Sequence, residues 1–494
     1  MSRIRETFRH IPVAARWCAL VAMANALVWS LIVPPFQVPD ENAHFAYIQH
    51  LAETGEPPRF VAGPGASDAQ FQVEIALNEF DVSTRPENRP IWTELEQRNL
   101  ERVLDSGLSR SNGGGQSNST NNPPLYHLLG VVAYAAGSWG DLLDRFALLR
   151  LVSVLLAGVT VLFTFGFLRE LLPRSPLLWT VGGLAVAFQP LFGFMAGGVN
   201  NDVLLAATAA ALLFGVARAL RRGLTPRRAA GIGAALGLGL VSKATLLAFA
   251  PALAVAAVVL LRRAVAAERV ALLRSIGVAA GVAAVPVLAY VLVNGLIWDR
   301  ALWSGTAQFS AGTSDAVGSA ESSVREQIAY IWQWYLPRMP FMNDQFAGGY
   351  YPLYENSFKG FIGRFGWNDY GFTGWVYELA VGVVAVLFGL VGAALWRARA
   401  ALRRRSGELA VYIIAVLGLA VVIGLPGYTA KESGTGFEQA RYYLPLLPLY
   451  GAVVALAVRG AGRRAGPAAA AAVVVLAMAH SLFAQLITIA RYYG

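Results

Sequence analysis

The residues best suited to chemistry follow the first apolar run of the chain, in the segment PDENAHF at positions 39–45. Asp40 stands where a helix N-cap belongs, and an amphipathic helix is predicted to continue to about Thr54. Asp40 and Glu41 lie four and three residues before His44, so all three side chains can share one helix face. A pair of carboxylates at a membrane surface can keep one member as a general base near neutral pH. The alternative is a capping Asp40 and a solvated Glu41, a cap being worth about 1 kcal/mol.

Further polar residues stand at the junctions of later apolar runs, on the side of the membrane predicted for Asp40. They are Asn200, Asn201 and Asp202 in one turn, Lys243 in a second, and Arg441 with Tyr442 in a third. A lysine between apolar helices and far from the basic loops needs an anion nearby. Each residue has an ordinary alternative, such as a helix cap for Asp202, a headgroup anchor for Arg441 and an aromatic-belt position for Tyr442. Taken together, carboxylates with two cations at one rim favour a base beside a phosphate clamp.

Three other residues are candidates for substrate binding. His127 follows the segment PPLY at 123–126 and is either a polar tip beside the site or an interfacial side chain. Arg364 and Trp367 lie in the segment GRFGW at 363–367, where the aromatic ring suits either a sugar ring or the membrane interface. The spacing of Asp40 and His44 also suits two metal ligands, so a divalent cation stays open as a cofactor. No third or fourth ligand can be named, and we assign no metal residue.

The composition excludes several classes of protein. Of 494 residues, 56% are hydrophobic and only 14% are charged, whereas soluble domains carry nearer a quarter charged residues. With a mean hydropathy of +0.50, the chain is predicted to be a polytopic all-α membrane protein. Its net charge of +10 comes from basic clusters between apolar runs, which is typical of cytoplasmic loops and not of a nucleic-acid-binding protein. The single cysteine, Cys18, excludes a disulfide scaffold.

Eleven apolar runs predict the membrane-spanning helices, with a range of 11–13 for their number. The runs are Trp17–Val33, Phe146–Leu168, Leu177–Met195, Asp202–Leu220, Ala229–Val241, Ala244–Leu261, Ile276–Ile297, Val376–Trp396, Leu409–Leu425, Tyr442–Val458 and Ala468–Ile489. With the N-terminus in the cytoplasm, every cytoplasmic loop contains arginines, and together these loops contain only four acidic residues, Glu6, Glu170, Glu268 and Glu408. The first run ends in VPPF without a small-residue cleavage site, so we expect it to be a retained helix and not a signal peptide.

This topology divides the chain into three parts. Residues 1–298 form a core that includes a first outer loop at 34–145, residues 299–375 form a second outer loop, and residues 376–494 form the C-terminal spans. Within the first loop, the Gly/Ser/Asn tract at 109–122 is predicted to be mobile. The apolar stretch that follows it, to Ala136, is predicted to be a half-inserted or interfacial helix with proline at its start.

In this order, PDExxHF, PPLY, NND, SK at a helix junction, GRFGW and QxRYxxP, the motifs resemble those of bacterial membrane proteins of the DUF2142 type. These are similar to GT-C glycosyltransferases that use polyprenyl-phosphate sugars, and the resemblance covers about residues 20–455. It implies a helical GT-C fold with the catalytic acid at Asp40 and Glu41 beside it. It also implies that Lys243 and Arg441 occupy the positions that hold the lipid phosphate. Where many relatives have a proline after Asp-Glu, this chain has Asn42, which removes no catalytic group.

The expected activity is therefore inverting transfer of a sugar from a polyprenyl-phosphate donor to an envelope glycan, glycolipid or protein. The site would lie on the outer face of the bacterial cytoplasmic membrane, among membrane lipids and without nucleic acid. One alternative is a polymerase or ligase of lipid-diphosphate-linked polysaccharide. Others are a transporter or lipid flippase and a non-catalytic scaffold. Transporters place ionisable groups near the centres of their spans, whereas here the polar groups gather at one face.

Overall fold

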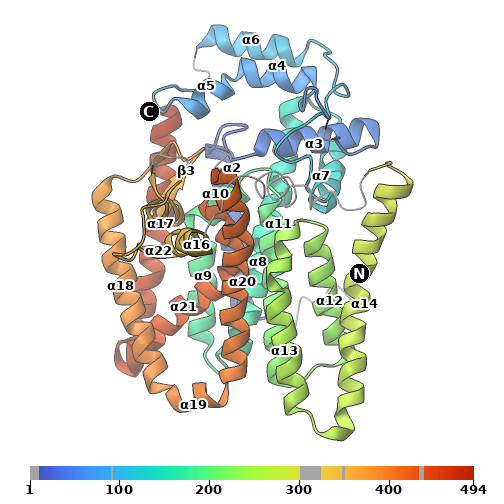
Figure 1. The fold of residues 1–494 in the computed structure, drawn as a ribbon. Coiled ribbons are helices and arrows are strands. Elements are labelled where there is room, and N and C mark those ends of the chain that lie inside the picture. The colour runs from blue at the N-terminus through green and yellow to red at the C-terminus, as the bar shows by residue number, and fades with distance from the viewer. Residues whose placement is uncertain (1–10, 60, 91–92, 301–323, 348–350, 433–438) are drawn as a thin grey trace.

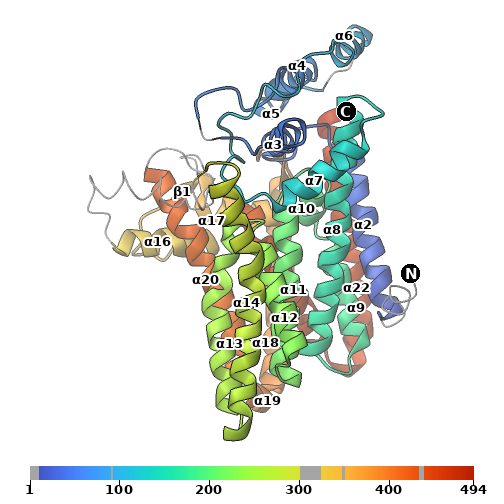
Figure 2. The same ribbon diagram turned by 90° about the vertical axis from the view of Figure 1, so that its right-hand side faces the viewer.

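Long apolar helices run side by side through most of the molecule, and shorter helices gather at one of its ends (Figure 1; Figure 2). The structure is a computed structural model, and it describes residues 11–59, 61–90, 93–300, 324–347, 351–432 and 439–494. Helix is the dominant element, and the only strands in these ranges form two short hairpins. The prediction of an all-α polytopic membrane protein is confirmed.

Nine helices in the described part of the chain are long and apolar enough to cross a membrane, or ten when one bent pair is counted as a span. They are α2 (Val13–Ile32), α8 (Leu142–Leu171), α11 (Asp202–Arg222), η1 with α13 (Ala244–Phe249 and Ala250–Arg263), α14 (Ala266–Leu296), α18 (Gly374–Arg397), α20 (Ser406–Glu432), η4 with α21 (Ala440–Leu446 and Leu447–Gly460) and α22 (Gly462–Tyr493). Each of the eleven predicted runs lies on one or two of the helices of the bundle. The count differs because of two runs, at 177–195 and 229–241.

The run at 177–195 is broken into α9 (Pro176–Ala187) and α10 (Pro190–Ala196), which meet at 58°. Pro190 cannot continue a helix, because it lacks an N–H and its ring clashes with the preceding turn. The Ala187 carbonyl accepts a hydrogen bond from Asn25 Nδ2 at 2.9 Å, and Asn25 Oδ1 accepts from Ser481 and Gln485 of α22. Asn25 of α2 thus bonds a carbonyl that the break leaves free, and two side chains of α22 hold Asn25 in place.

The run at 229–241 lies on α12 (Pro226–Leu240), a helix of 15 residues. It is too short to count as a span by length, but it packs along both α11 and α14. We therefore correct the predicted number of eleven or more spans to nine or ten by length and hydropathy, with α12 as a shorter helix of the bundle.

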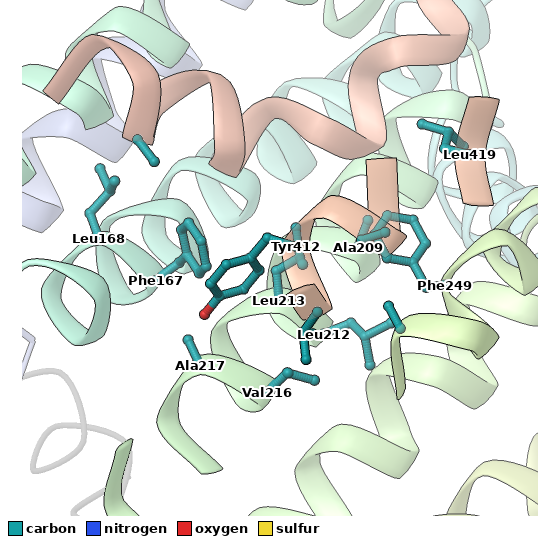
Figure 3. Packing of buried hydrophobic residues seen from close by; sticks show 14 of the residues in the cluster. Phe167, Leu168, Ala209, Leu212, Leu213, Val216, Ala217, Phe249, Tyr412 and Leu419 are labelled. Carbon is teal, nitrogen blue, oxygen red and sulfur yellow. The ribbon is translucent and has the colours of Figure 1, made fainter. Parts of the chain in front are cut away.

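Large apolar side chains fill the space between α8, α11, η1 and α20 (Figure 3). Phe167 of α8 and Tyr412 of α20 meet edge to face, with ring centroids 5.5 Å apart. Elsewhere small residues bring helices close together, as at Gly182 of α9, where an added Cβ would lie 2.6 Å from the Gly451 carbonyl oxygen of α21. This packing fixes the ends of the helices, and the candidate site is built on those ends.

The short elements at one end come from two segments of the chain. The first segment contributes α3 (Glu41–Thr54), α4 (Asp68–Ala76), α5 (Glu79–Thr84), α6 (Glu94–Leu104) and α7 (Leu125–Ala136). The second contributes α16 (Val324–Tyr335), α17 (Leu353–Gly363), the hairpin β1–β2 (Phe346–Ala347 and Tyr351–Pro352) and the hairpin β3–β4 (Arg364–Phe365 and Tyr370–Gly371). The helix predicted to run to Ala136 is confirmed as α7, and its depth in the membrane stays a prediction.

The arginine clusters lie at the opposite end of the bundle. This end holds the loops after α11, α13 and α21, together with α19 (Arg399–Arg404) (Figure 1). The predicted separation of an arginine-rich end from the end that bears Asp40 is thus present in the fold. The assignment of the arginine-rich end to the cytoplasm stays a prediction, and the arginines before residue 11 lie outside the described residues.

The prediction that the tract at 109–122 is mobile is wrong. Its backbone pairs with a neighbouring loop, since Gly114 N–H donates to the Gly65 carbonyl at 3.0 Å and Gly114 accepts from Arg59 N–H at 2.8 Å. Gly114 has a φ of +94°, and a Cβ there would lie 2.4 Å from the His50 ring. The glycines therefore allow a close backbone approach that other residues would prevent.

Candidate functional site

Asp40 is the N-cap residue of α3, as predicted, but its side chain does not cap the helix. Its backbone is left-handed, with φ 62° and ψ 10°, and its side chain makes no capping bond. One carboxylate oxygen instead forms an ion pair with the Arg441 guanidinium, and the other accepts from Asn118 Nδ2 at 3.0 Å. A non-glycine residue held in this conformation costs of order 1 kcal/mol. Asp40 thus occupies the predicted N-cap position, but the capping bond is absent, and the left-handed backbone directs its carboxylate toward Arg441.

A chain of alternating charges continues from Arg441. This residue is the second of η4 and donates to the Pro39 carbonyl at 3.1 Å, while its Nε lies 3.7 Å from Asp202 Oδ2. Asp202 begins α11, and its other oxygen accepts from Lys243 Nζ at 2.5 Å. We call Asp40, Arg441, Asp202 and Lys243 the rim cluster. Its members come from four segments far apart in sequence, and all stand where a helix begins or a span ends.

Tyr442 covers both cations of the rim cluster. Its ring centroid lies 5.4 Å from Lys243 Nζ and 5.4 Å from Cζ of Arg441. An aromatic face at this distance attracts a cation by about 0.5–2 kcal/mol, depending on how far water is excluded. Tyr442 therefore holds the two cations in place, which the aromatic-belt interpretation did not include.

Asn200 and Asn201 shape the turn that presents Asp202. Asn200 donates from Nδ2 to the Pro39 carbonyl at 3.0 Å, and its Oδ1 accepts from Asp202 N–H at 2.8 Å. Asn201 donates to the Ser242 carbonyl at 3.4 Å, next to Lys243. Both side chains are buried. They connect the segments that carry the rim cluster and fix its geometry.

Glu41 points away from the rim cluster. Its side chain is fully buried, and its two oxygens accept from Nε and Nη2 of Arg150 at 2.9 and 2.8 Å. The same carboxylate accepts from Val199 N–H at 2.8 Å, while Arg150 also donates to the carbonyls of Ser30, Val33 and Pro34. Glu41 thus joins the end of α2 and the start of α3 to α8, and no part of its side chain is exposed to a substrate in this structure.

His44 and His127 form a buried pair beside the rim cluster. His44 Nδ1 and His127 Nε2 are 3.1 Å apart, so one ring nitrogen donates a hydrogen bond to the other. His127 stacks on Tyr47, with ring centroids 3.8 Å apart. The pair joins α3, which carries His44, to α7, which carries His127. The preceding residue of α7, Tyr126, accepts from Asn200 N–H at 2.8 Å and so connects α7 to the turn before α11.

The electrostatics of the site keep Asp40 charged and His44 neutral. Burial opposes the ionisation of Asp40, but the charge and hydrogen bond of Arg441 outweigh it and hold the pKa of Asp40 well below its usual range. Burial lowers the pKa of His44 to about 4. The negative charge of Asp40 raises this pKa and is outweighed, and the positive charge of Lys243 acts in the same direction as burial. At neutral pH the rim cluster therefore holds two negative and two positive charges beside an uncharged histidine.

We expect His44 to make the protein less stable as the pH falls from 6.5 to 4. In the unfolded chain His44 takes up a proton below about pH 6.5, but the folded pKa of about 4 resists this, so folding becomes less favourable across that window. The loss should reach roughly 2–3 kcal/mol through this group. Thermal unfolding in detergent measures it as the difference between wild type and His44→Gln at each pH. A difference that does not change between pH 7 and pH 4.5 would contradict the assignment.

Arg364 and Trp367 belong to a neighbouring region. Arg364 lies on β3, close to Tyr377, and Trp367 lies in the turn of the β3–β4 hairpin. The turn is held by Asp369, which accepts from Trp367 N–H at 3.0 Å and pairs with Arg491 of α22 at 3.2 Å. Trp367 is thus part of a second polar group, centred on Asp369, and its predicted contact with substrate stays a prediction.

Sequence analysis missed two residues that contact the site. Arg150 is the only charged residue within the run at 146–168, near the end that faces Glu41, and a charge in such a run predicts a buried partner. Asn118 was assigned to a mobile tract, and its contact with Asp40 depends on how that tract packs. For a divalent cation, no group of three or more His, Cys, Asp or Glu side chains that could hold a metal occurs within the described ranges.

The fold and the rim cluster define a polytopic α-helical membrane protein with a charged site at one end of its bundle. Its sequence belongs to the family of predicted membrane proteins called DUF2142, whose profile matches residues 25–450. No curated protein matches the sequence.

Solved structures of an oligosaccharyltransferase from Archaeoglobus fulgidus are similar to the chain. One, tethered to an acceptor peptide containing the NVT sequon, has 14% sequence identity and a TM-score of 0.49 over 97% of this chain and 55% of that one. Another, the oligosaccharyltransferase AglB in complex with an inhibitory peptide and a dolichol-phosphate, has 13% identity and a TM-score of 0.48 over 97% of this chain and 56% of that one. This chain thus spans about half the length of the enzymes that it matches.

Proposed function

We propose that the protein is an inverting glycosyltransferase that takes its sugar from a polyprenyl-phosphate donor at the outer face of the cytoplasmic membrane. The observation that carries the proposal is the rim cluster, in which two carboxylates and two cations from four segments meet at the end of the bundle opposite the arginine-rich loops. A lipid-linked donor stays in the membrane plane, so a site at the ends of the spans can reach its phosphate. The acceptor would be a glycan, glycolipid or protein.

Asp40 is the proposed general base. It accepts the proton of the acceptor hydroxyl while that oxygen attacks the anomeric carbon of the sugar. The bond between the anomeric carbon and the phosphate oxygen breaks, and polyprenyl phosphate leaves with the bonding pair. Lys243 and Arg441 stabilise the charge on this leaving group. A single displacement of this kind inverts the anomeric configuration.

The pairing of Asp40 with Arg441 suggests that the donor itself activates the base. While Arg441 is paired with Asp40, it lowers the pKa of that carboxylate, which makes it a weak base. A donor phosphate competes with Asp40 and Asp202 for the guanidinium and for Lys243, because phosphate is a strong bidentate acceptor. As Arg441 turns to the phosphate, the pKa of Asp40 rises and the carboxylate is released toward the acceptor. The carboxylates thus occupy the phosphate positions until substrate arrives.

Glu41 has a positioning role in this proposal. Its contacts with Arg150 and Val199 fix the chain on the N-terminal side of α3, and so fix where Asp40 points. We propose Asp40 alone as the base, because the Glu41 carboxylate is fully buried and already accepts three hydrogen bonds.

The test is turnover of lipid-linked sugars by the purified protein in nanodiscs. Radiolabelled polyprenyl-monophosphate sugars are offered with an envelope extract as acceptor, and a parallel series contains polyprenyl-diphosphate glycans. Transfer from a monophosphate donor, with inverted configuration in the product, supports the proposal. Transfer from diphosphate donors alone would replace it with a polymerase or ligase. If folded protein leaves every donor unchanged but moves labelled lipid across the bilayer, the protein is a flippase.

Lys243→Ala should raise the KM for the donor about 10- to 100-fold, since it removes one charge-assisted contact to phosphate. The effect on kcat should be smaller, as Arg441 still faces the leaving group. Lys359→Ala is the matched control, because Lys359 pairs with Glu355 on α17, outside the rim cluster. Steady-state kinetics with varied donor separate the two constants. Equal KM values for both variants would remove Lys243 from the phosphate site.

A further inference from the structure

A cavity of about 590 Å³ lies at the arginine-rich end of the bundle, opposite the rim cluster. It is open on one side and is lined by the starts of α9 and α22 and by the ends of α18 and α21. Its walls are both apolar and basic. Leu178, Ala394 and Val458 line the apolar part, and three arginines, Arg397, Arg459 and Arg463, line the rest. We call this space the basic cavity.

The three arginines form no ion pair within the described ranges of the chain. Two acidic residues at this end of the bundle pair with other arginines: Glu170 pairs with Arg222, and Glu408 pairs with Arg405. Arg397 donates to the Gly460 carbonyl at 2.8 Å at the end of α21. Arg397 and Arg459 stand in the last turns of α18 and α21, where the helix dipole favours a cation, and Arg463 stands in the first turn of α22, where it does not. Three cations at one cavity repel one another, and an anion among them would relieve this repulsion.

Two helices begin at the basic cavity without the groups that normally complete a helix start. α22 has Ala461 at its cap, no acidic residue in its first turn, and two arginines there, Arg463 and Arg464. α9 follows Ser175, whose side chain makes no capping bond, and it too has no acidic residue in its first turn. A helix N-terminus carries a partial positive charge that disfavours cations and attracts anions. The starts of α9 and α22 therefore add to the field of the arginines, while the ends of α18 and α21 carry the opposite partial charge and face Arg397 and Arg459.

We propose that the basic cavity binds the headgroup of an anionic phospholipid, with the phosphate among Arg397, Arg459 and Arg463. A lipid fits better than a free anion, because the cavity is part apolar and lies at the ends of membrane spans. Trp396 and Leu177 beside it are exposed on the outside of the bundle, at the level where acyl chains meet headgroups. The lipid would join α9 and α22 to α18 and α21. This site is separate from the proposed transfer chemistry and does not depend on it.

The test uses the full-length protein purified in a mild neutral detergent. Binding of phosphatidylglycerol is compared with binding of phosphatidylcholine by native mass spectrometry and by titration with a fluorescent lipid. The test variant carries Arg397→Gln, Arg459→Gln and Arg463→Gln. The matched control carries Arg227→Gln, Arg269→Gln and Arg274→Gln, which remove the same charge from the same end but outside the cavity; the arginines of both sets are exposed, so only their position differs.

We expect wild type and control to retain phosphatidylglycerol in preference to phosphatidylcholine. The test variant should bind it roughly 100-fold more weakly, because each arginine near an anionic headgroup contributes about one kcal/mol. Equal affinity in all three proteins would overturn the proposal. So would an equal loss in test and control variants, since that result indicates a diffuse surface charge. Displacement of the lipid by millimolar inorganic phosphate would assign the cavity to a free anion.

Discussion

Asp40→Asn should lower sugar transfer by about 10²- to 10⁴-fold, the range by which a positioned general base accelerates a reaction. Asparagine has the same shape and can still accept from Asn118, but it cannot take a proton from the acceptor hydroxyl. The variant also frees Arg441 from its ion pair with Asp40, so donor binding should be unchanged or tighter. A fall in kcat with no rise in donor KM is therefore the expected kinetic result, measured with labelled donor in nanodiscs.

The matched control for this variant is Asp369→Asn. Asp369 also pairs with an arginine, Arg491 near the end of α22, at 3.2 Å, but it lies in the β3–β4 hairpin outside the rim cluster. It should cost stability and leave kcat within a few-fold of wild type. Folding of both variants is checked by size-exclusion chromatography and thermal unfolding. Transfer at the wild-type rate by folded Asp40→Asn protein would remove Asp40 as the base.

The helices and the meeting of the polar residues could be predicted from the sequence, for a simple physical reason. Apolar runs of membrane length have their ends at the two surfaces, and arginines mark one of them. Polar residues at alternate junctions, such as Asp202 and Lys243, must then share the other surface. The structure places these two side chains in direct contact, 2.5 Å apart.

Which residue contacts which at the rim could not be predicted from helix periodicity. The spacing of Asp40, Glu41 and His44 placed all three on one helix face, on the assumption of regular helix throughout. The left-handed backbone at Asp40 breaks that regularity. As a result the carboxylate of Asp40 meets Arg441, and that of Glu41 meets Arg150, 109 residues away. A backbone conformation stabilised by contacts so distant in sequence leaves no local pattern.

The glycine-rich tract shows a second limit. Its composition is typical of a flexible linker, but composition does not show whether a segment packs against the rest of the chain. Here its small residues allow the backbone to pass against His50 and the loop at 61–65, and this brings Asn118 to Asp40. The glycines here let the backbone pack closely against its neighbours and do not make the segment a flexible linker.

Glu41→Gln should be the most destabilising single change among the residues of the site, by about 3–5 kcal/mol. It leaves the buried Arg150 guanidinium without its counter-charge, and the cost of an uncompensated buried charge exceeds that of a lost surface pair. The fall in stability is measured by thermal and SDS-induced unfolding in mixed micelles. Transfer should fall too, in proportion to the loss of folded protein and of Asp40 positioning.

Two further variants test whether the loss of stability comes from the unpaired charge of Arg150 or would follow any change of a buried side chain in this region. Glu79→Gln is the control, since burial, with help from the charges of Glu74 and Glu41, raises the pKa of Glu79 to about 7. Neutralising Glu79 should therefore leave stability unchanged or increase it. In the double variant Glu41→Gln with Arg150→Met, no buried charge remains. The double variant should therefore lose less stability than the sum of the losses of the two single variants, with a coupling free energy of about 1–3 kcal/mol. Additive losses would mean that the two side chains stabilise the fold independently, and Glu41 would then have no role in orienting Asp40 through Arg150.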